Sequence, residues 1–84
     1  MPRLAESPVR PLRAGDGSLK AIALGRRRLR VVRALERWRE SGEWWEGEQE
    51  REVTRLLLAD GAVVEVSAPP GGGDVGWRLE AWFD

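Results

Sequence analysis

Two runs rich in β-branched and aliphatic residues, 53–59 and 62–68, flank an Asp-Gly pair in the second half of the chain. Such a pair between two β-rich runs is the strongest short hairpin signal, because a tight type I′ turn needs positive φ at both of its central residues. A two-residue loop at Asp60-Gly61 then predicts these cross-strand pairs: Leu57 with Val64, Val53 with Ala68, and Leu58 with Val63. Both faces carry apolar residues near the turn, which predicts a sheet that is covered on both sides or curls into a barrel.

The C-terminal segment alternates strictly between apolar and other residues. Trp77, Leu79, Ala81 and Phe83 fall on one face, and Trp82 falls on the charged face with Arg78 and Glu80. This alternation predicts a strand with one wholly apolar face. With the glycine-rich loop 69–74 before it, the range 51–83 is predicted to form a three-stranded antiparallel meander.

Residues 28–39 fit two different structures. Leu29, Val32, Leu35 and Trp38 recur every three residues, which is close to a helix period, and Ser41-Gly42 would end such a helix. The β-branched pair Val31-Val32 and the alternation over 28–31 instead favour a strand, with a β-bulge after Val31. Periodicity alone slightly favours the helix, so both remain open at this point.

The first 18 residues contain Pro2, Pro8 and Pro11 together with Gly15 and Gly17. Proline lacks a backbone N–H donor, so we expect an irregular segment here, although short edge strands near 3–6 or 9–13 remain compatible with the pattern. A short apolar run at 19–24 predicts a strand, and the Gly-Arg-Arg at 25–27 predicts the turn after it. The expected organisation is an irregular segment, 1–18, followed by one small domain, 19–84.

The net charge of zero conceals a strong asymmetry along the chain. Residues 1–39 hold eleven basic and three acidic residues, 11 − 3 = +8, and residues 40–84 hold three basic and eleven acidic ones, 3 − 11 = −8. Either the two halves neutralise each other in the fold, or the first half binds a polyanion.

Five arginines lie within eight residues of the basic half and form the candidate binding site: Arg26, Arg27, Arg28, Arg30 and Arg33. On a strand, Arg26, Arg28 and Arg30 would share one face at a repeat of about 7 Å, close to the spacing of successive phosphates on one nucleic-acid strand. Single-strand binders combine such basic faces with stacking aromatic rings. The alternatives are a solvated edge strand and a site for an acidic protein.

Two tryptophans are candidate aromatic contacts for a partner, Trp45 and Trp82. Trp45 follows Trp44 directly, so on a strand only one of the two can face the core. Trp82 falls on the charged face of its predicted strand, and an exposed tryptophan is a credible interface anchor.

The chain contains no histidine and no cysteine. The commonest general base, the cysteine nucleophile and thiolate zinc sites are thereby absent, so we expect no enzymatic activity, no metal and no cofactor. The Glu-rich stretch 40–52 has no ligand spacing of a known cation loop. The N-terminus lacks the apolar region of a signal peptide and no apolar run could span a membrane, so we expect a cytoplasmic protein without membrane contact.

A series of motifs resembles a small bacterial domain of unknown function, which also occurs at the C-terminus of ImuB-like Y-family DNA polymerase homologues. These motifs are Trp38, Gly42-Glu43-Trp44-Trp45, Asp60-Gly61, Gly76-Trp77-Arg78-Leu79 and Trp82-Phe83-Asp84. The resemblance covers about residues 20–84. It implies an all-β module without catalytic residues, acting near damage-tolerance DNA synthesis, and hence a strand rather than a helix over 28–40.

These patterns together predict an all-β fold, a small antiparallel sheet of five or six strands curled into a partly open barrel. The alternative is an α+β fold with a helix at 28–40 packed on the C-terminal meander. The predicted core is Trp38, one of Trp44 and Trp45, Leu57, Val64, Trp77, Leu79 and Phe83. The expected function is an accessory module that contacts single-stranded nucleic acid or a DNA-repair protein, with protein interaction or homo-oligomerisation as the alternative.

Overall fold

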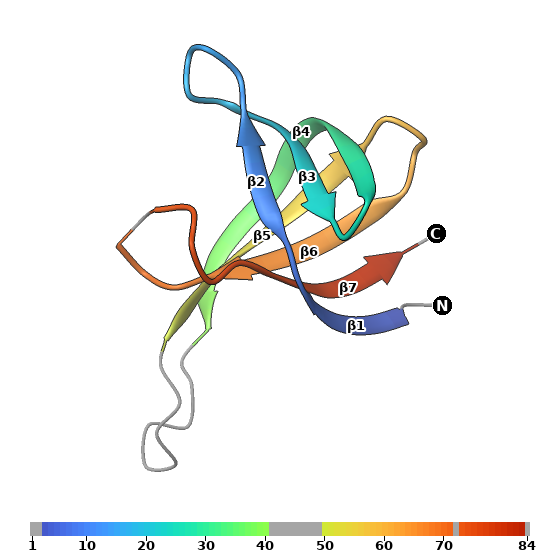
Figure 1. Ribbon diagram of the computed structural model, residues 1–84. Helices are drawn as coiled ribbons and strands as arrows, with labels where there is room; N and C mark the ends of the chain where they lie inside the picture. Colours follow the sequence, from blue (N-terminus) through green and yellow to red (C-terminus); the bar gives the residue numbers. More distant parts are fainter. Residues whose placement is uncertain (1–2, 41–49, 72, 84) are drawn as a thin grey trace.

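The computed structural model describes residues 3–40, 50–71 and 73–83, and for residues 3–6 the backbone alone. The described part is an antiparallel sheet without a helix (Figure 1). Its strands are β1 (Arg3–Pro8), β2 (Arg10–Arg13), β3 (Leu19–Leu24), β4 (Arg27–Glu40), β5 (Arg51–Leu58), β6 (Val63–Ala68) and β7 (Arg78–Phe83). The all-β class is confirmed, and the strand count is seven instead of five or six.

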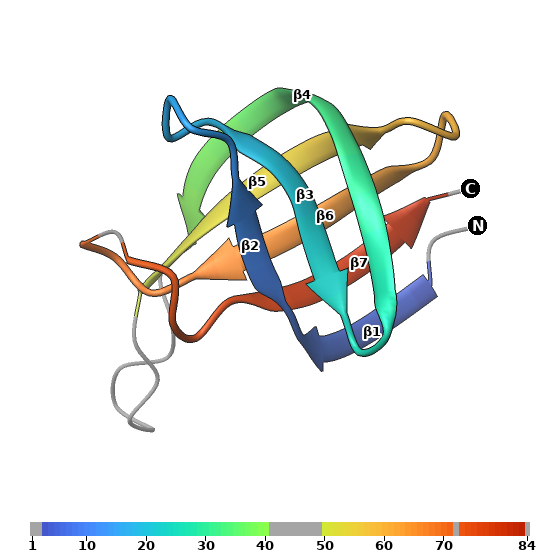
Figure 2. The ribbon, with the colours of Figure 1, turned by 45° about the horizontal axis from the view of Figure 1, so that its top comes forward.

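The sheet has the order β1-β7-β6-β5-β4-β3-β2, so its two edge strands follow each other directly in the chain. Only Val9 separates β1, which pairs with β7, from β2, which pairs with β3. The Val9 amide donates to the carbonyl of Trp77 at 3.1 Å. The chain therefore leaves one end of the sheet and enters the other, and the sheet curls into a partly open barrel (Figures 1 and 2).

The N-terminal segment, expected to be irregular, supplies both edge strands. Pro8 is the last residue of β1, and Pro11 lies in β2, which has a neighbour on one side only. At these positions the missing N–H donor costs the sheet little, which is why proline is tolerated in edge strands. The expectation of an irregular segment is therefore wrong, and the edge strands that the pattern left open are present.

The ambiguous segment 28–39 belongs to β4, which contains two bulges. The pairing skips one residue between Val31 and Arg33, where the sequence indicated a bulge, and a second between Ala34 and Glu36. Val32 and Leu35 are the extra residues, and they are 59% and 37% exposed. Because each bulge lets two successive residues oppose one, the apolar spacing departs from two and imitates a helix.

The hairpin at Asp60-Gly61 has a three-residue loop in place of the predicted two-residue one. The Gly61 amide donates to the Leu58 carbonyl at 3.0 Å, Gly61 has φ of 92°, and Leu58 pairs with Ala62. This is a type I turn followed by a left-handed glycine. The register therefore shifts by one residue, Leu56 faces Val64, and the predicted pairs are wrong.

A bulge at Glu80 divides β7 into two parts whose residues alternate oppositely. Glu65 pairs with Ala81 but the next residue, Val66, pairs with Leu79, so Glu80 is the extra residue. Leu79 lies in the core, and beyond the bulge Trp82 packs against the core while the ring of Phe83 lies 5.9 Å from the Arg55 guanidinium. The prediction of one wholly apolar face is wrong from Ala81 onward.

The core consists mainly of aliphatic side chains. Val64 and Leu79, both predicted, have no exposed surface, while Leu56 and Leu58 occupy the place expected for Leu57. Trp77 packs at the margin of the core, and Trp38, Leu57 and Phe83 are half-buried outside it. The core cluster is Val9, Ile22, Leu29, Leu56, Leu58, Ala62, Val64, Val66 and Leu79. Trp44 and Trp45 lie outside the described residues, which include no helix long and apolar enough to cross a membrane.

Candidate nucleic-acid interface

Three neighbouring strands form a flat, basic surface on the outside of the barrel. Two rows of paired residues cross β2, β3 and the start of β4: Arg10–Ala23–Arg28 and Leu12–Ala21–Arg30. Ile22 and Leu29 of the same strands lie in the core, so alternation places these six side chains on the outer face. We call this surface the arginine face.

The geometry of the arginine face follows from sheet spacing. Arg28 and Arg30 are separated by about 7 Å along β4, and Arg10 lies two strands away, at about 10 Å from Arg28. The middle strand contributes the half-buried Ala23 and Ala21, which is 1% exposed. Long guanidinium side chains thus stand on both sides of a shallow floor.

The electrostatics of this part of the chain are almost uniformly basic. Residues 10–35 contain eight cations and one carboxylate, 8 − 1 = +7. That carboxylate, Asp16, accepts hydrogen bonds from the Ser18 hydroxyl at 2.6 Å and the Ser18 amide at 2.9 Å, and these bonds lower its pKa. Asp16 is therefore already engaged in its own turn and does not neutralise the arginine face.

The arginine face has no partner among the described residues. Arg10, Arg28 and Arg30 are exposed and form no ion pair or side-chain hydrogen bond in the described part of the chain. Within that part, only Arg13 and Arg39 of the basic half pair with carboxylates of the acidic half, at Asp74 and at Glu50 and Glu52. The ion pairs between the two halves thus leave the guanidinium groups of Arg10, Arg28 and Arg30 without a partner among the described residues.

The five arginines of the sequence prediction do not form one strip. Arg28 and Arg30 lie on the arginine face, and Arg26 occupies the adjoining β3–β4 turn with Gly25. Arg27 lies 5.4 Å from the centre of the Trp82 ring, and Arg33 lies beyond the first bulge of β4. Sequence reasoning missed Arg10, because only the strand order brings β2 beside β3.

The aromatic candidates do not join this surface. Trp82 is half-buried against the core beneath Arg27, and Trp45 lies outside the described residues. The described rings all lie off the arginine face: Trp38, Trp77, Trp82 and Phe83. In the part of the chain that the structure describes, the face therefore offers guanidinium forks for phosphate and no ring for base stacking.

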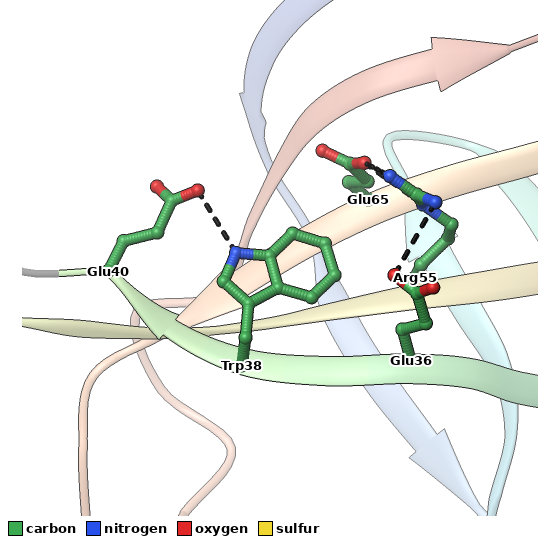
Figure 3. Close-up of polar contacts among 5 residues, drawn as sticks. All are labelled: Glu36, Trp38, Glu40, Arg55 and Glu65. Atoms are coloured by element: carbon green, nitrogen blue, oxygen red, sulfur yellow. Dashed lines mark hydrogen bonds and ion pairs between the residues drawn. The ribbon is translucent and has the colours of Figure 1, made fainter.

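A second polar cluster, on the outer face of β4–β7, satisfies its own charges (Figure 3). Arg55 donates to Glu65 at 2.7 and 3.1 Å and lies 3.5 Å from Glu36. Its guanidinium stands 5.5 Å from the Trp38 ring, and Trp38 donates its indole N–H to Glu40 at 3.1 Å. The bonds to Glu65 raise the pKa of Arg55. This cluster holds strands together and leaves no free charge for a ligand.

The buried hydroxyl of Ser67 also forms hydrogen bonds that connect strands. Ser67 is 1% exposed, donates to Glu80 at 2.5 Å and accepts from the Arg51 guanidinium at 2.9 Å. Arg51 also donates to the Gly76 carbonyl at 2.6 Å, and its burial lowers its pKa. Both hydrogen bonds of the Ser67 hydroxyl thus join neighbouring strands. The described residues also contain no cluster of three or more metal-ligating side chains.

Fold and surface together define a small antiparallel barrel, partly open, with one outer sheet face that is basic and unpaired. No family model, curated protein or solved structure matches the chain. The resemblance to the polymerase-associated domain stays a prediction.

Proposed function

We propose that this chain is a non-catalytic accessory module whose arginine face binds the phosphate backbone of single-stranded nucleic acid. The observation that carries the proposal is the unpaired set Arg10, Arg28 and Arg30, held across three strands of one rigid sheet. Guanidinium forks match phosphate oxygens, and strand pairing fixes the backbone positions from which these three side chains extend.

Two further observations support a nucleic acid over a solvated edge. Charge that only prevents edge-to-edge pairing needs to lie on the edge strand, yet Arg28 and Arg30 belong to β4, which has neighbours on both sides. The resemblance to a domain found with Y-family polymerase homologues favours DNA as the polyanion. Backbone contact without stacking gives binding that is nearly independent of base sequence.

The test measures binding of a fluorescently labelled single-stranded oligonucleotide by anisotropy at low salt. Arg28→Glu combined with Arg30→Glu should abolish binding, because the change removes two phosphate contacts and adds two repulsive charges. Arg28→Glu alone is compared with Arg78→Glu alone, which makes the same charge change on β7, outside the arginine face. We expect the first to weaken binding strongly and the second only slightly.

Equal losses in the two single variants would show a general charge effect and would contradict the assignment of the face. Absence of oligonucleotide binding by the unmodified chain at low salt would reject the proposal altogether. Urea midpoints of all variants separate loss of binding from loss of folding.

A protein-interaction or self-association module is the second candidate, and the exposed apolar residues of β4 favour it. Val32 and Leu35 present apolar surface at the two bulges, and a contiguous exposed apolar patch is typical of an interaction site. Light scattering over a range of concentrations tests self-association. A mass above that of one chain, lost in a Val32→Ser, Leu35→Ser variant, supports this candidate, and a constant monomer mass excludes the homo-oligomer.

A further inference from the structure

The open end of the barrel contains a hollow of about 600 Å³. Its walls come from the β2–β3 loop, the middle of β4, the facing part of β5, and the end of β6 with the loop that follows it. These segments meet toward the left of Figure 2. The volume lies within the range of small-molecule sites, about 300–1000 Å³.

The floor of the hollow is the end of the hydrophobic core. Leu56 and Val66, both core residues, line it together with Leu19, Val31 and Trp77, which pack against the core. Val32, the extra residue of the first β4 bulge, also lines it. Leu56 and Val66 are themselves almost fully buried, so the exposed apolar surface of the hollow belongs to Leu19, Val31, Val32 and Trp77, and covering it from water would be favourable.

The charged residues on the walls are mostly cationic. Arg13, Arg33 and Arg37 line the hollow with one carboxylate, Glu52, 3 − 1 = +2. Arg13 is paired with Asp74 at 3.1 Å and Glu52 with Arg39 at 3.4 Å. Arg33 and Arg37 form no ion pair or side-chain hydrogen bond within residues 3–40, 50–71 and 73–83. Arg37, which pairs with Thr54, lies on the same face of the sheet as the core residue Leu56, whereas Arg33 pairs with Leu57 and lines the hollow from its rim.

We infer that this hollow is a binding site for a small organic anion with an apolar body and a carboxylate or phosphate head. The apolar body contacts Leu19, Val31 and Trp77, and Arg37 holds the head, with Arg33 adding positive charge at the rim. Arg37 lies opposite Thr54, whose hydroxyl on the same wall can donate a further hydrogen bond. This site is separate from the arginine face, since Arg10, Arg28 and Arg30 do not line it.

The probe is 8-anilinonaphthalene-1-sulfonate, an apolar ring system with an anionic head, titrated against the whole chain by fluorescence. We expect one saturable site per chain. Decanoate and decyl phosphate should displace the probe, and the order of their affinities distinguishes a carboxylate from a phosphate ligand. Decyltrimethylammonium, with the same apolar chain and a cationic head, should not displace it. Displacement by all three alike would overturn the assignment of an anion site.

Two variants test the residues. Arg33→Gln with Arg37→Gln should weaken probe binding by about tenfold or more, as expected for loss of charged hydrogen bonds. The matched control, Arg28→Gln with Arg30→Gln on the arginine face, should leave probe binding unchanged. Ala34→Phe places a ring in the hollow from an exposed wall position and should abolish probe binding while both arginines remain.

Probe binding that survives Ala34→Phe would overturn the inference, as would equal losses in the two arginine pairs. Urea midpoints show whether each variant is folded. If the Arg33→Gln, Arg37→Gln variant does not fold, the result with Ala34→Phe tests the inference. Loss of oligonucleotide binding in the Arg33, Arg37 variant with unchanged probe binding would assign these arginines to the nucleic-acid interface instead. Failure of oligonucleotide binding alone leaves this site intact.

Discussion

At the scale of single residues, the arginines of this chain fall into two groups with different roles. Arg51 and Arg55 are held by several hydrogen bonds and connect neighbouring strands. Arg10, Arg28 and Arg30 make no such contacts within the described residues and remain available to a ligand. Both groups look alike in the sequence, because the distinction depends on which carboxylates and carbonyls the sheet brings nearby.

Arg51→Met should lower the free energy of unfolding by about 2 kcal/mol, because the Ser67 hydroxyl and the Gly76 carbonyl lose a charged donor. Urea denaturation followed by tryptophan fluorescence measures the change. Arg78→Met is the control, since Arg78 is exposed and makes no ion pair among the described residues. Its effect should stay within about 0.5 kcal/mol. Equal losses at both positions would contradict the role given to Arg51.

At the scale of secondary-structure elements, the sequence predicted most strands and missed the irregularities within them. The hairpin at Asp60-Gly61 and the strand over 78–83 were recognisable from turn chemistry and alternation. The bulges at Leu35 and Glu80 were not, because neither has a local signal and each depends on the partner strand. The hairpin loop shifts the register of β5 by one residue and the Glu80 bulge moves Phe83 to the other face, so the core holds Leu56 and Leu58 in place of the predicted Leu57 and Phe83.

The same limit applies to the candidate site. Arg28 and Arg30 were predictable as neighbours on one face, because the alternation in that part of β4 is regular. Arg10 was not, because its place depends on the curled sheet order that sets β2 beside β3. Arg33 does not lie on the arginine face because a bulge precedes it in β4.

Gly61→Ala should destabilise the fold by about 1 kcal/mol, because φ at this position is 92° and L-residues avoid that region. A Cβ there would meet nothing within 4 Å, so the cost is conformational. Gly15→Ala is the matched control, since it also meets nothing within 4 Å and needs no positive φ. Thermal unfolding should show a lower midpoint for Gly61→Ala and an unchanged midpoint for Gly15→Ala. Similar midpoints would contradict the positive φ at Gly61.

At the scale of the whole molecule, the fold keeps its charges segregated. Described ion pairs join Arg13, Arg39 and Arg55 to carboxylates, while the arginine face gains none. A chain with zero net charge can therefore carry a strongly basic surface. The barrel makes this arrangement rigid, because β3 and β4 are paired on both sides.

The salt dependence of single-stranded oligonucleotide binding tests the central claim most directly. Three phosphate contacts from Arg10, Arg28 and Arg30 predict a slope of about −2 in a plot of log K against log salt concentration, at about −0.7 per contact. Arg28→Gln with Arg30→Gln should reduce the slope to about −0.7, while Arg78→Gln leaves it unchanged. A slope near zero in the unmodified chain, or an unchanged slope in the double variant, would contradict the account.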